Sequence, residues 1–423
     1  MQRRATRLAA GIAAAASVLA LTACGSGFSG GSSGSGSSSG SSGNGLTSSK
    51  SALTVLIGSS GDAETAAVKS AVADWSQSSG TKATVQAASN LQQQLSQGFA
   101  AKKPADVFYL GSDTFATYAK QGDLLAYGDL LKNKSDYYPS LVTNFTYQGK
   151  FYCAPKDFST LQLEINTDMW KAAGLTAKDY PTSWDQLATV AKKLTKGKVT
   201  GLVTSAQYER LGALMVEAGG NLTNADGTKA TVDSAANQKA LTYVQNALKA
   251  GWWKFTNDVG AGWGGEAFGK QEAAMTIEGN WIAGAMTTTY PKVHYAVVPL
   301  PAGPAGKGTL QFTNCWGIAS ASKNQAAALK LVEQLTTAKD QLGFAKAFGV
   351  MPSIQSAAAQ WKQQFPQFSA FLDGASDAQG VPKSVGSAAV VADMDSKLAG
   401  LKTLDIKSLL ATEQKNLAAT MQG

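Results

Sequence analysis

Short apolar runs alternate with segments of helical periodicity in the chain after residue 52. Leu53–Ile57 and Asp106–Leu110 are apolar without strict alternation, which is typical of parallel strands covered on both faces. Residues 62–78 place apolar side chains three and four positions apart, and residues 114–120 have helical character directly after the second run. This order predicts a strand, a helix, a strand and a helix, the beginning of an α/β fold.

The same alternation continues further along the chain. Ser183 begins a Ser-x-x-Gln capping box and Asp233 is predicted to cap a second helix, each ahead of an apolar helical face. Met275–Glu278 and Tyr295–Val298 are predicted strands, and Asn324 precedes another amphipathic helix. The sequence shows no internal repeat, so we expect one α/β architecture throughout rather than stacked copies of a unit.

The first 52 residues have a different composition. Three arginines precede the apolar stretch Leu8–Leu21, which is too short for a permanent membrane span and predicts a signal peptide over residues 1–23. Leu21–Cys24 resembles the lipobox of bacterial lipoproteins, which implies a lipid on Cys24 and attachment to the outer face of the cell membrane. Residues 24–52 are mostly Gly and Ser, so we expect a flexible tether.

Charge and residue usage exclude several classes of function. The formal charge is +8, of which the signal peptide holds three, and the other lysines are dispersed, which argues against a nucleic-acid partner. His294 is the only histidine and lies in a strand-like segment, where a structural or partly exposed histidine is expected rather than a base or a ligand. Because zinc and P-loop motifs are absent from the sequence, we expect no metal and no cofactor.

Several segments, in order, resemble the family 1 extracellular solute-binding proteins, which include the maltose-binding receptors of ABC importers. The matching segments are 105–110, 115–116 and 122–125, then 149–157 and 163–170, then 273–281, 298–301, 314–319 and 322–324. The resemblance implies a two-lobed periplasmic-binding-protein-like α/β fold with hinge-crossing strands and a ligand in the cleft between the lobes. It implies a monomeric, non-enzymatic receptor that binds a sugar for an ABC importer.

The resemblance also implies the domain boundaries. Lobe 1 begins with residues 53–157, residues 158–313 are mainly lobe 2 with a return to lobe 1 near their end, and 314–423 contains the hinge return and C-terminal helices. Cys153 and Cys315 both fall in segments that resemble crossing strands, so a disulfide is expected, with two buried free thiols as the alternative. Leu110 stands where sugar-binding relatives can carry an aromatic residue, so the sugar need not be maltose.

Binding sites for sugars combine carboxylates or amides with aromatic faces. Trp281 stands where the family positions a stacking aromatic residue, with core packing as the alternative. Asp157 at the hinge is expected to accept hydroxyl hydrogen bonds, or else to cap a helix or pair with Lys156. Asp113 follows a parallel strand, where it faces the crevice or caps a helix. Trp263 lies in a Gly-rich loop and is expected either at the rim of the cleft or simply exposed. Four further candidates are placed only by approximate correspondence with the family: Tyr208, Glu209, Ser59 and Asp62.

Two alternatives to a sugar receptor stay open. A receptor for another polar solute, such as a polyamine or a phosphodiester, needs a different set of charges in the same cleft. A secreted carbohydrate-active enzyme needs paired carboxylates, and Asp157 with Glu266 or Glu278 is the candidate pair. Turnover of an oligosaccharide separates the enzyme from a receptor, which releases its ligand unchanged.

Overall fold

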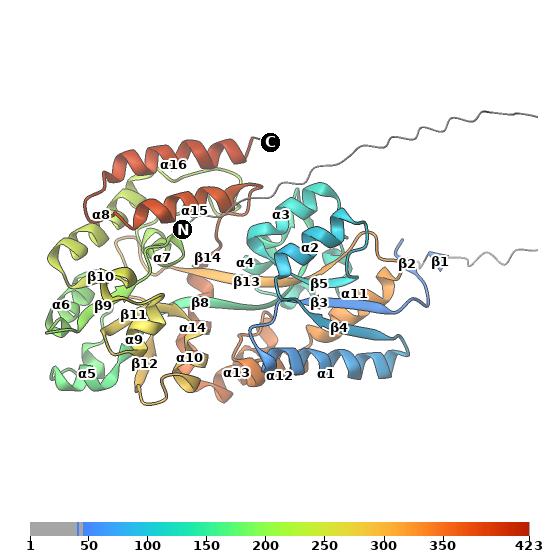
Figure 1. Cartoon of the computed structure of the whole chain (residues 1–423), viewed down its shortest axis with the longest axis horizontal. Helices are drawn as coiled ribbons and strands as arrows, with labels where there is room; N and C mark the ends of the chain where they lie inside the picture. Colours follow the sequence, from blue (N-terminus) through green and yellow to red (C-terminus); the bar gives the residue numbers. More distant parts are fainter. Residues whose placement is uncertain (1–39, 42–44, 423) are drawn as a thin grey trace, which may run out of the picture. The chain divides into compact units, whose positions relative to one another are not determined.

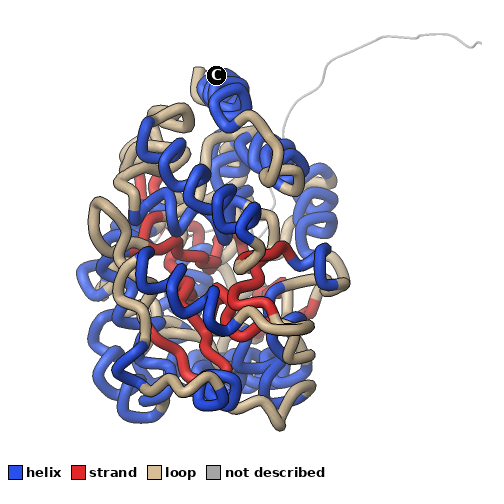
Figure 2. The backbone as a smooth tube through the Cα atoms, turned by 90° about the vertical axis from the view of Figure 1, so that its left-hand side faces the viewer, coloured by secondary structure: helices blue, strands red, loops and turns tan. Residues whose placement is uncertain are grey.

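A computed structural model of the chain describes residues 40–41 and 45–422 (Figure 1). The predicted signal peptide and Cys24 lie outside the described residues. Within them, ten strands form one mixed sheet in which β10, β9, β11, β8, β13, β5, β3 and β4 follow one another, with β12 beside β8 and β14 beside β13. Figure 2 shows these strands inside the fold with helices on either side. The predicted α/β class is confirmed.

One half of the sheet is built from the N-terminal strands. β3 (Leu53–Ile57) pairs in parallel with β4 (Ala83–Ala87) and β5 (Val107–Gly111), and β3 begins and ends where the apolar run predicts. Helices surround this half: α1 (Asp62–Ser79), α2 (Leu91–Ala100), α3 (Ser112–Gln121), α4 (Pro139–Asn144), α11 (Gln325–Leu335), α12 (Ala338–Phe348) and α13 (Ala358–Gln364). The hairpin of β6 (Thr146–Tyr147) and β7 (Lys150–Phe151) follows α4.

The other half of the sheet has the same parallel character. β9 (Thr200–Thr204) lies between β10 (Trp253–Phe255) and β11 (Ala273–Gly279) and is parallel to both. Its helices are α5 (Thr167–Ala172), α6 (Trp184–Leu194), α7 (Tyr208–Glu217), α8 (Ala235–Ala250), α9 (Gly264–Gly269), α10 (Ile282–Thr288), α15 (Ser387–Leu398) and α16 (Ile406–Thr420). Trp252 and Trp253 are buried here, as expected for packing residues.

Two long antiparallel strands join the halves. β8 (Ala154–Asn166) is buried along its whole length, and it pairs with β13 (Thr309–Ile318) at its start and with β11 and β12 (Tyr295–Val298) towards its end. β13 in turn pairs with β5 and with β14 (Ala378–Gln379), while α14 (Ser369–Asp373) packs against β8. These are the crossing strands that the family resemblance implies, and they carry backbone hydrogen bonds from one lobe to the other.

Two helix starts differ in detail from the capping predictions. Ser183 accepts the backbone N–H of Gln186 as predicted, but the Gln186 side chain returns to Thr182 instead of completing the box. The prediction that Asp233 caps α8 is wrong, because Ser234 is the N-cap and accepts the N–H of Asn237. Adjacent polar residues compete for the same cap, and the path of the incoming chain decides between them.

The last predicted tether residues are part of the folded structure. Leu46 is buried, and the Thr47 hydroxyl donates to the carbonyl of Ser322 at 2.8 Å. The Thr47 amide donates to the Gln325 side chain at 3.1 Å, and Asn324 donates to the carbonyl of Ser51. Residues 46–51 therefore bind the start of α11; we call them the N-terminal strap. No helix among the described residues is long and apolar enough to span a bilayer.

Candidate functional site

A cavity of about 260 Å³ lies where the crossing strands meet the ends of β3 and β11. Its walls come from the β3–α1 turn, from β8, from β13 and from the turn between β11 and α10, so residues far apart in the sequence converge on it. The side chains that matter most are polar or aromatic: Ser60, Glu64, Asp157, Ser159, Trp281 and Phe312. The two residues given the clearest roles by the sequence, Asp157 and Trp281, are brought together in this one cavity.

Trp281 is the exposed aromatic residue of the cavity. It follows β11, and 39% of its surface is accessible. Its ring packs nearly perpendicular to that of Phe312, with centroids 5.6 Å apart. The turn before it is anchored at both sides, because the Asn280 amide donates to Ser159 at 3.0 Å and the Asn280 side chain donates to the Gly349 carbonyl at 2.8 Å. A β-carbon at Gly279 would strike the indole ring, so glycine is required there.

A buried ion cluster forms another part of the cavity wall. The Lys156 ammonium contacts the Asp157 carboxylate, lies 3.3 Å from Glu64 Oε1 and sits 4.3 Å above the Tyr109 ring centre. Burial raises the pKa of Glu64, but the Lys156 charge and hydrogen bonds from Ser60 outweigh it, and the net pKa is lowered. Burial raises the pKa of Asp157 despite Lys156. The Asp157–Lys156 pair, which the sequence offered as the alternative role, is thus present at the cavity wall.

The other lobe-1 candidates lie near the cavity but do not line it. The Ser59 hydroxyl donates to the Gly61 carbonyl at 2.6 Å and accepts from Thr65 at 2.7 Å, which organises the turn into α1. Asp62 is exposed at the first position of α1, and Asp113 is exposed at the second position of α3. Neither aspartate is the N-cap of its helix. Their roles as ligand contacts remain predictions.

The lobe-2 candidates lie in the core, at the start of α7 and at the start of α9. Tyr208 is fully buried and donates from its hydroxyl to Asn221 at 2.6 Å, so its side chain belongs to the lobe-2 core. Glu209 is half-buried beside Asp395, whose pKa rises to about 7 because of burial and the nearby Glu209 charge. Trp263 is half-buried at the start of α9 and packs on the core. None of the three lines the cavity.

Three residues at the site were missed or treated as secondary. Glu64 is buried in the first turn of α1, and the sequence indicates Lys156 only as a partner of Asp157. Arg210 places its guanidinium carbon 5.3 Å from the Trp281 ring centre. The sequence contains one signal that could have identified Glu64. Position 64 falls on the apolar face of residues 62–78, and a charged residue on a buried face needs a partner from elsewhere in the chain.

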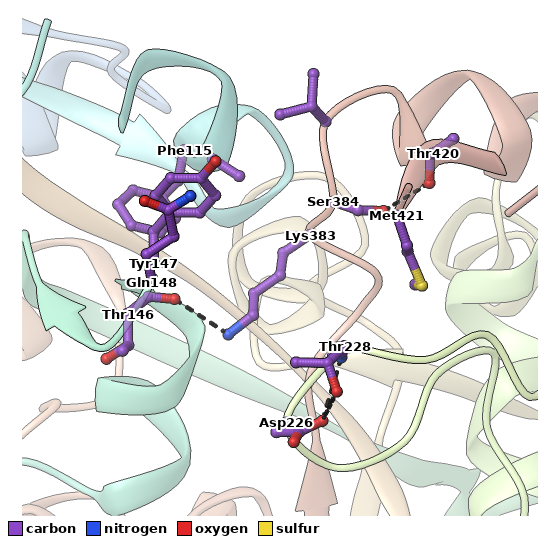
Figure 3. Close-up of a pocket in the computed structure, with 13 residues that line it drawn as sticks. Phe115, Thr146, Tyr147, Gln148, Asp226, Thr228, Lys383, Ser384, Thr420 and Met421 are labelled. Atoms are coloured by element: carbon purple, nitrogen blue, oxygen red, sulfur yellow. Dashed lines mark hydrogen bonds between the residues drawn. The ribbon is translucent and has the colours of Figure 1, made fainter. Parts of the chain in front are cut away.

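A larger cavity of about 340 Å³ lies away from this site, between α3 and the hairpin on one side and residues 226–228 and 383–385 on the other (Figure 3). Lys383 crosses it and donates to the backbone carbonyl of Thr143, and burial lowers its pKa. None of the candidate ligand contacts named from the sequence lines this cavity. We therefore place the candidate site at the cavity that contains Trp281 and Asp157.

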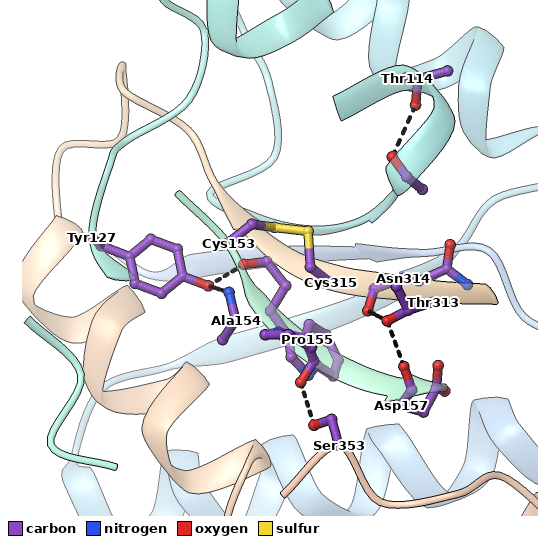
Figure 4. Close-up of a disulfide and its surroundings, with 12 residues drawn as sticks. Thr114, Tyr127, Cys153, Ala154, Pro155, Asp157, Thr313, Asn314, Cys315 and Ser353 are labelled. Carbon is purple, nitrogen blue, oxygen red and sulfur yellow. Dashed lines mark hydrogen bonds between the residues drawn. A yellow bond between two sulfur atoms is a disulfide. The ribbon is translucent and has the colours of Figure 1, made fainter. Parts of the chain in front are cut away.

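Cys153 and Cys315 are joined by a disulfide beside the crossing strands, with Cα atoms 5.6 Å apart (Figure 4). Both residues are fully buried. Nearby, the Tyr127 hydroxyl accepts the Ala154 amide at 2.8 Å, and the Ser353 hydroxyl donates to the Pro155 carbonyl at 2.6 Å. The start of β8 is therefore fixed to β13 and to its surroundings by covalent and hydrogen bonds.

The carboxylates considered for catalysis are already bonded within the protein. Glu278 is completely buried and accepts from Arg210 and Trp281. Glu266 pairs with Lys270 and accepts the Gly262 amide at 2.7 Å. His294 is exposed and lies 2.8 Å from Asp168. Each of these side chains therefore has at least one partner within the protein.

Two α/β lobes joined by crossing strands, with a polar and aromatic cavity where the strands meet, define a solute-binding receptor. The family profile described as bacterial extracellular solute-binding protein matches residues 58–342. The chain belongs to this family.

Relatives and solved structures agree with this assignment. The diacetylchitobiose binding protein DasA of Streptomyces coelicolor is 27% identical over 295 residues, covering 66% of this chain and 68% of that protein. The sugar-binding protein MalE of Xanthomonas citri has a TM-score of 0.77 at 19% identity, covering 88% of this chain and 98% of that one. UgpB of Mycobacterium tuberculosis, in complex with glycerophosphocholine, has a TM-score of 0.75 at 18% identity, with coverage of 88% and 98%. At these identities the solved structures show the fold, and the predicted two-lobed class is confirmed.

Proposed function

We propose that this protein is an extracytoplasmic receptor that binds a mono- or oligosaccharide at the crossing strands and delivers it to an ABC importer. One observation carries the proposal: a single cavity presents the exposed face of Trp281 next to Asp157 and the hydroxyl of Ser159. A sugar has apolar C–H faces that stack on aromatic rings and hydroxyls that need directional hydrogen bonds. The cavity offers a partner for each.

The charges of the cavity favour an uncharged ligand. Glu64 and Asp157 surround the ammonium of Lys156, and Arg210 is paired with Glu278 at 2.8 Å. No cation of this group is left without a carboxylate, which disfavours a phosphodiester such as the one bound by the structural relative UgpB. A polyamine needs several carboxylates free of lysine and arginine, whereas Glu64 and Asp157 share Lys156 and leave only one negative charge in excess.

Relatives support the transport role. One relative is named a diacetylchitobiose binding protein, and another, from Deinococcus radiodurans, is named a probable ABC transporter-binding protein and is 30% identical over 243 residues, 55% of its own length. We infer that this chain likewise serves an importer as a monomer and lacks enzymatic activity. The lipobox resemblance supports a lipid anchor on Cys24 that holds the receptor outside the cell membrane.

A thermal-shift screen followed by calorimetric titration tests the ligand class. The panel contains diacetylchitobiose, maltotriose and acarbose as sugars, and glycerophosphocholine and spermidine as alternatives, because a ligand specific to the folded state raises its melting temperature. We expect a sugar to bind and to be recovered unchanged. Binding of spermidine or glycerophosphocholine alone contradicts the sugar assignment, and cleavage of a sugar contradicts the receptor.

Variants of the cavity residues test the location. Trp281→Ala removes a stacking face worth about 2 kcal/mol or more, so affinity should fall roughly thirtyfold. Asp157→Asn removes a charge-assisted acceptor worth about 1.5 to 3 kcal/mol, roughly tenfold or more in affinity. Asp185→Asn, on the exposed side of α6, is the matched control and should bind as the parent does. Parental affinity in both cavity variants, with folding checked by circular dichroism, shows that the site lies elsewhere.

A further inference from the structure

Glu278, near the end of β11, is completely buried although it is a carboxylate. Its Oε2 atom accepts three hydrogen bonds, from Trp281 Nε1 at 2.9 Å, from Arg210 Nε at 3.1 Å and from Arg210 Nη2 at 2.8 Å. Arg210 comes from α7, 68 residues earlier in the sequence. One carboxylate oxygen thus joins the aromatic residue of the ligand cavity to a cation on a different element.

Arg210 completes the enclosure of the indole. Its guanidinium carbon lies 5.3 Å from the Trp281 ring centre, and its side chain is only 12% exposed. Phe312 contacts the ring edge, while Gly279 leaves room for the ring where any β-carbon would collide with it. The indole is therefore held by its N–H bond and by contacts with Arg210 and Phe312, while 39% of the surface of Trp281 stays accessible.

Holding an exposed ring in one orientation has a direct consequence for binding. A tryptophan side chain that is free to change rotamer must be ordered when a ligand stacks on it, and this ordering lowers affinity by about three- to tenfold for one immobilised side chain. A ring that is already fixed avoids this loss. The hydrogen bond to a carboxylate is the strongest restraint on the indole, because a charged acceptor bonds more tightly than a neutral one.

We propose that Glu278 is a positioning residue of the ligand site: through its bonds to Trp281 and Arg210 it fixes the stacking face before the ligand arrives. Glu278 does not touch the ligand itself. The expected effect on ligand affinity rests on the proposed function. The restraint on the Trp281 ring does not, because it exists without any ligand. The competing explanation is that Glu278 serves only to neutralise Arg210 inside lobe 2.

The sheet supplies a matched control for the general effect of losing a buried carboxyl. Glu164 on the neighbouring strand β8 is also completely buried, and its Oε2 accepts the backbone N–H of Glu278 at 3.0 Å. Its hydrogen bonds reach neither the Trp281 nor the Arg210 side chain. Glu164→Gln therefore removes a buried carboxyl from the same place in the sheet without removing the restraint on the indole.

The first measurement needs no ligand. In ¹H–¹⁵N spectra of the whole protein, the Trp281 indole signal is identified among the nine tryptophans as the one lost in Trp281→Phe. We expect Glu278→Gln to speed exchange of this N–H with solvent about tenfold or more, whereas Glu164→Gln leaves it within twofold of the parent. Parental exchange in Glu278→Gln, or equal acceleration in both variants, overturns the proposal.

The second measurement is affinity for diacetylchitobiose and for maltotriose, titrated separately. Glu278→Gln should weaken whichever sugar the parent binds by about three- to tenfold, and it should add no further loss in a Trp281→Phe background, because both changes remove the same contact. A loss that simply adds, or a loss shared by Glu164→Gln, overturns the proposal. If Glu278→Gln does not fold, the affinity of Trp281→Phe takes its place. An affinity within twofold of the parent overturns the proposal, and a loss of three- to tenfold supports it. If the parent binds none of the sugars in the panel, the sugar assignment fails, while the exchange measurement still decides the restraint.

Discussion

Removal of the Cys153–Cys315 disulfide should destabilise the protein strongly while leaving the ligand cavity intact. The two cysteines are 162 residues apart in the sequence, and both are fully buried. The perturbation is the double variant Cys153→Ala with Cys315→Ala, which removes the cross-link without leaving two thiols. Neither cysteine lines the cavity that contains Trp281.

The magnitude follows from the length of the closed loop. In the chain-entropy model a cross-link over this separation lowers the free energy of the folded state relative to the unfolded chain by about 5 kcal/mol. Each buried sulfur replaced by a hydrogen removes about as much packing as one methylene, about 1 kcal/mol. The expected loss in the free energy of unfolding is therefore about 5 to 7 kcal/mol, a large share of the roughly 5 to 15 kcal/mol available to a folded protein.

Urea unfolding of the oxidised parent and the double variant measures this loss, because the midpoint and slope give the free energy in water. Calorimetric titration on the folded variant is the control, and it should match the parent within twofold. A loss below about 2 kcal/mol contradicts the entropic reasoning. Two thiols that react in the denatured, unreduced parent show that the bond does not form in the exported protein.

Three further predictions concern the anchor, the strap and a buried acid. Cys24→Ser should release the protein from membranes into the soluble fraction; unchanged detergent partitioning contradicts the lipobox interpretation. Leu46→Ala should lower the free energy of unfolding by about 2 to 3 kcal/mol and speed proteolysis near residue 46, because it removes a buried side chain of the N-terminal strap; parental urea midpoints refute this. Burial holds the pKa of Glu217 well above its usual value, so the folded state keeps a proton that the unfolded chain loses. Stability therefore falls, by at most about 1.4 kcal/mol per pH unit, from about pH 4.5 up to the pKa of Glu217 in the folded state. Glu217→Gln removes this pH dependence. The melting temperature of the variant should therefore exceed that of the parent by more at pH 8 than at pH 5, and an equal difference at both pH values contradicts the prediction.

Local pattern alone determined much of the fold. The apolar run at residues 53–57 gave β3 with its bounds, and helical spacing from residue 62 gave α1 to within one residue. These elements depend on contacts between near neighbours in the chain, which leave a periodic signature. The segments that resemble the solute-binding family, taken in their order along the chain, predicted the two lobes and the crossing strands. They also indicated Trp281 and Asp157 as site residues.

Only the tertiary structure decided the partners of the charged side chains. Lys156 meets Glu64 across 92 residues and Arg210 meets Glu278 across 68, and no spacing along the chain encodes such pairs. The same limit explains why the sequence did not locate the Tyr208 side chain. A tyrosine at the start of a helix fits a cleft contact as well as the buried position that it occupies. A periodic pattern says which face of an element is buried, whereas the direction and partner of a buried polar group depend on strands that pair far along the chain.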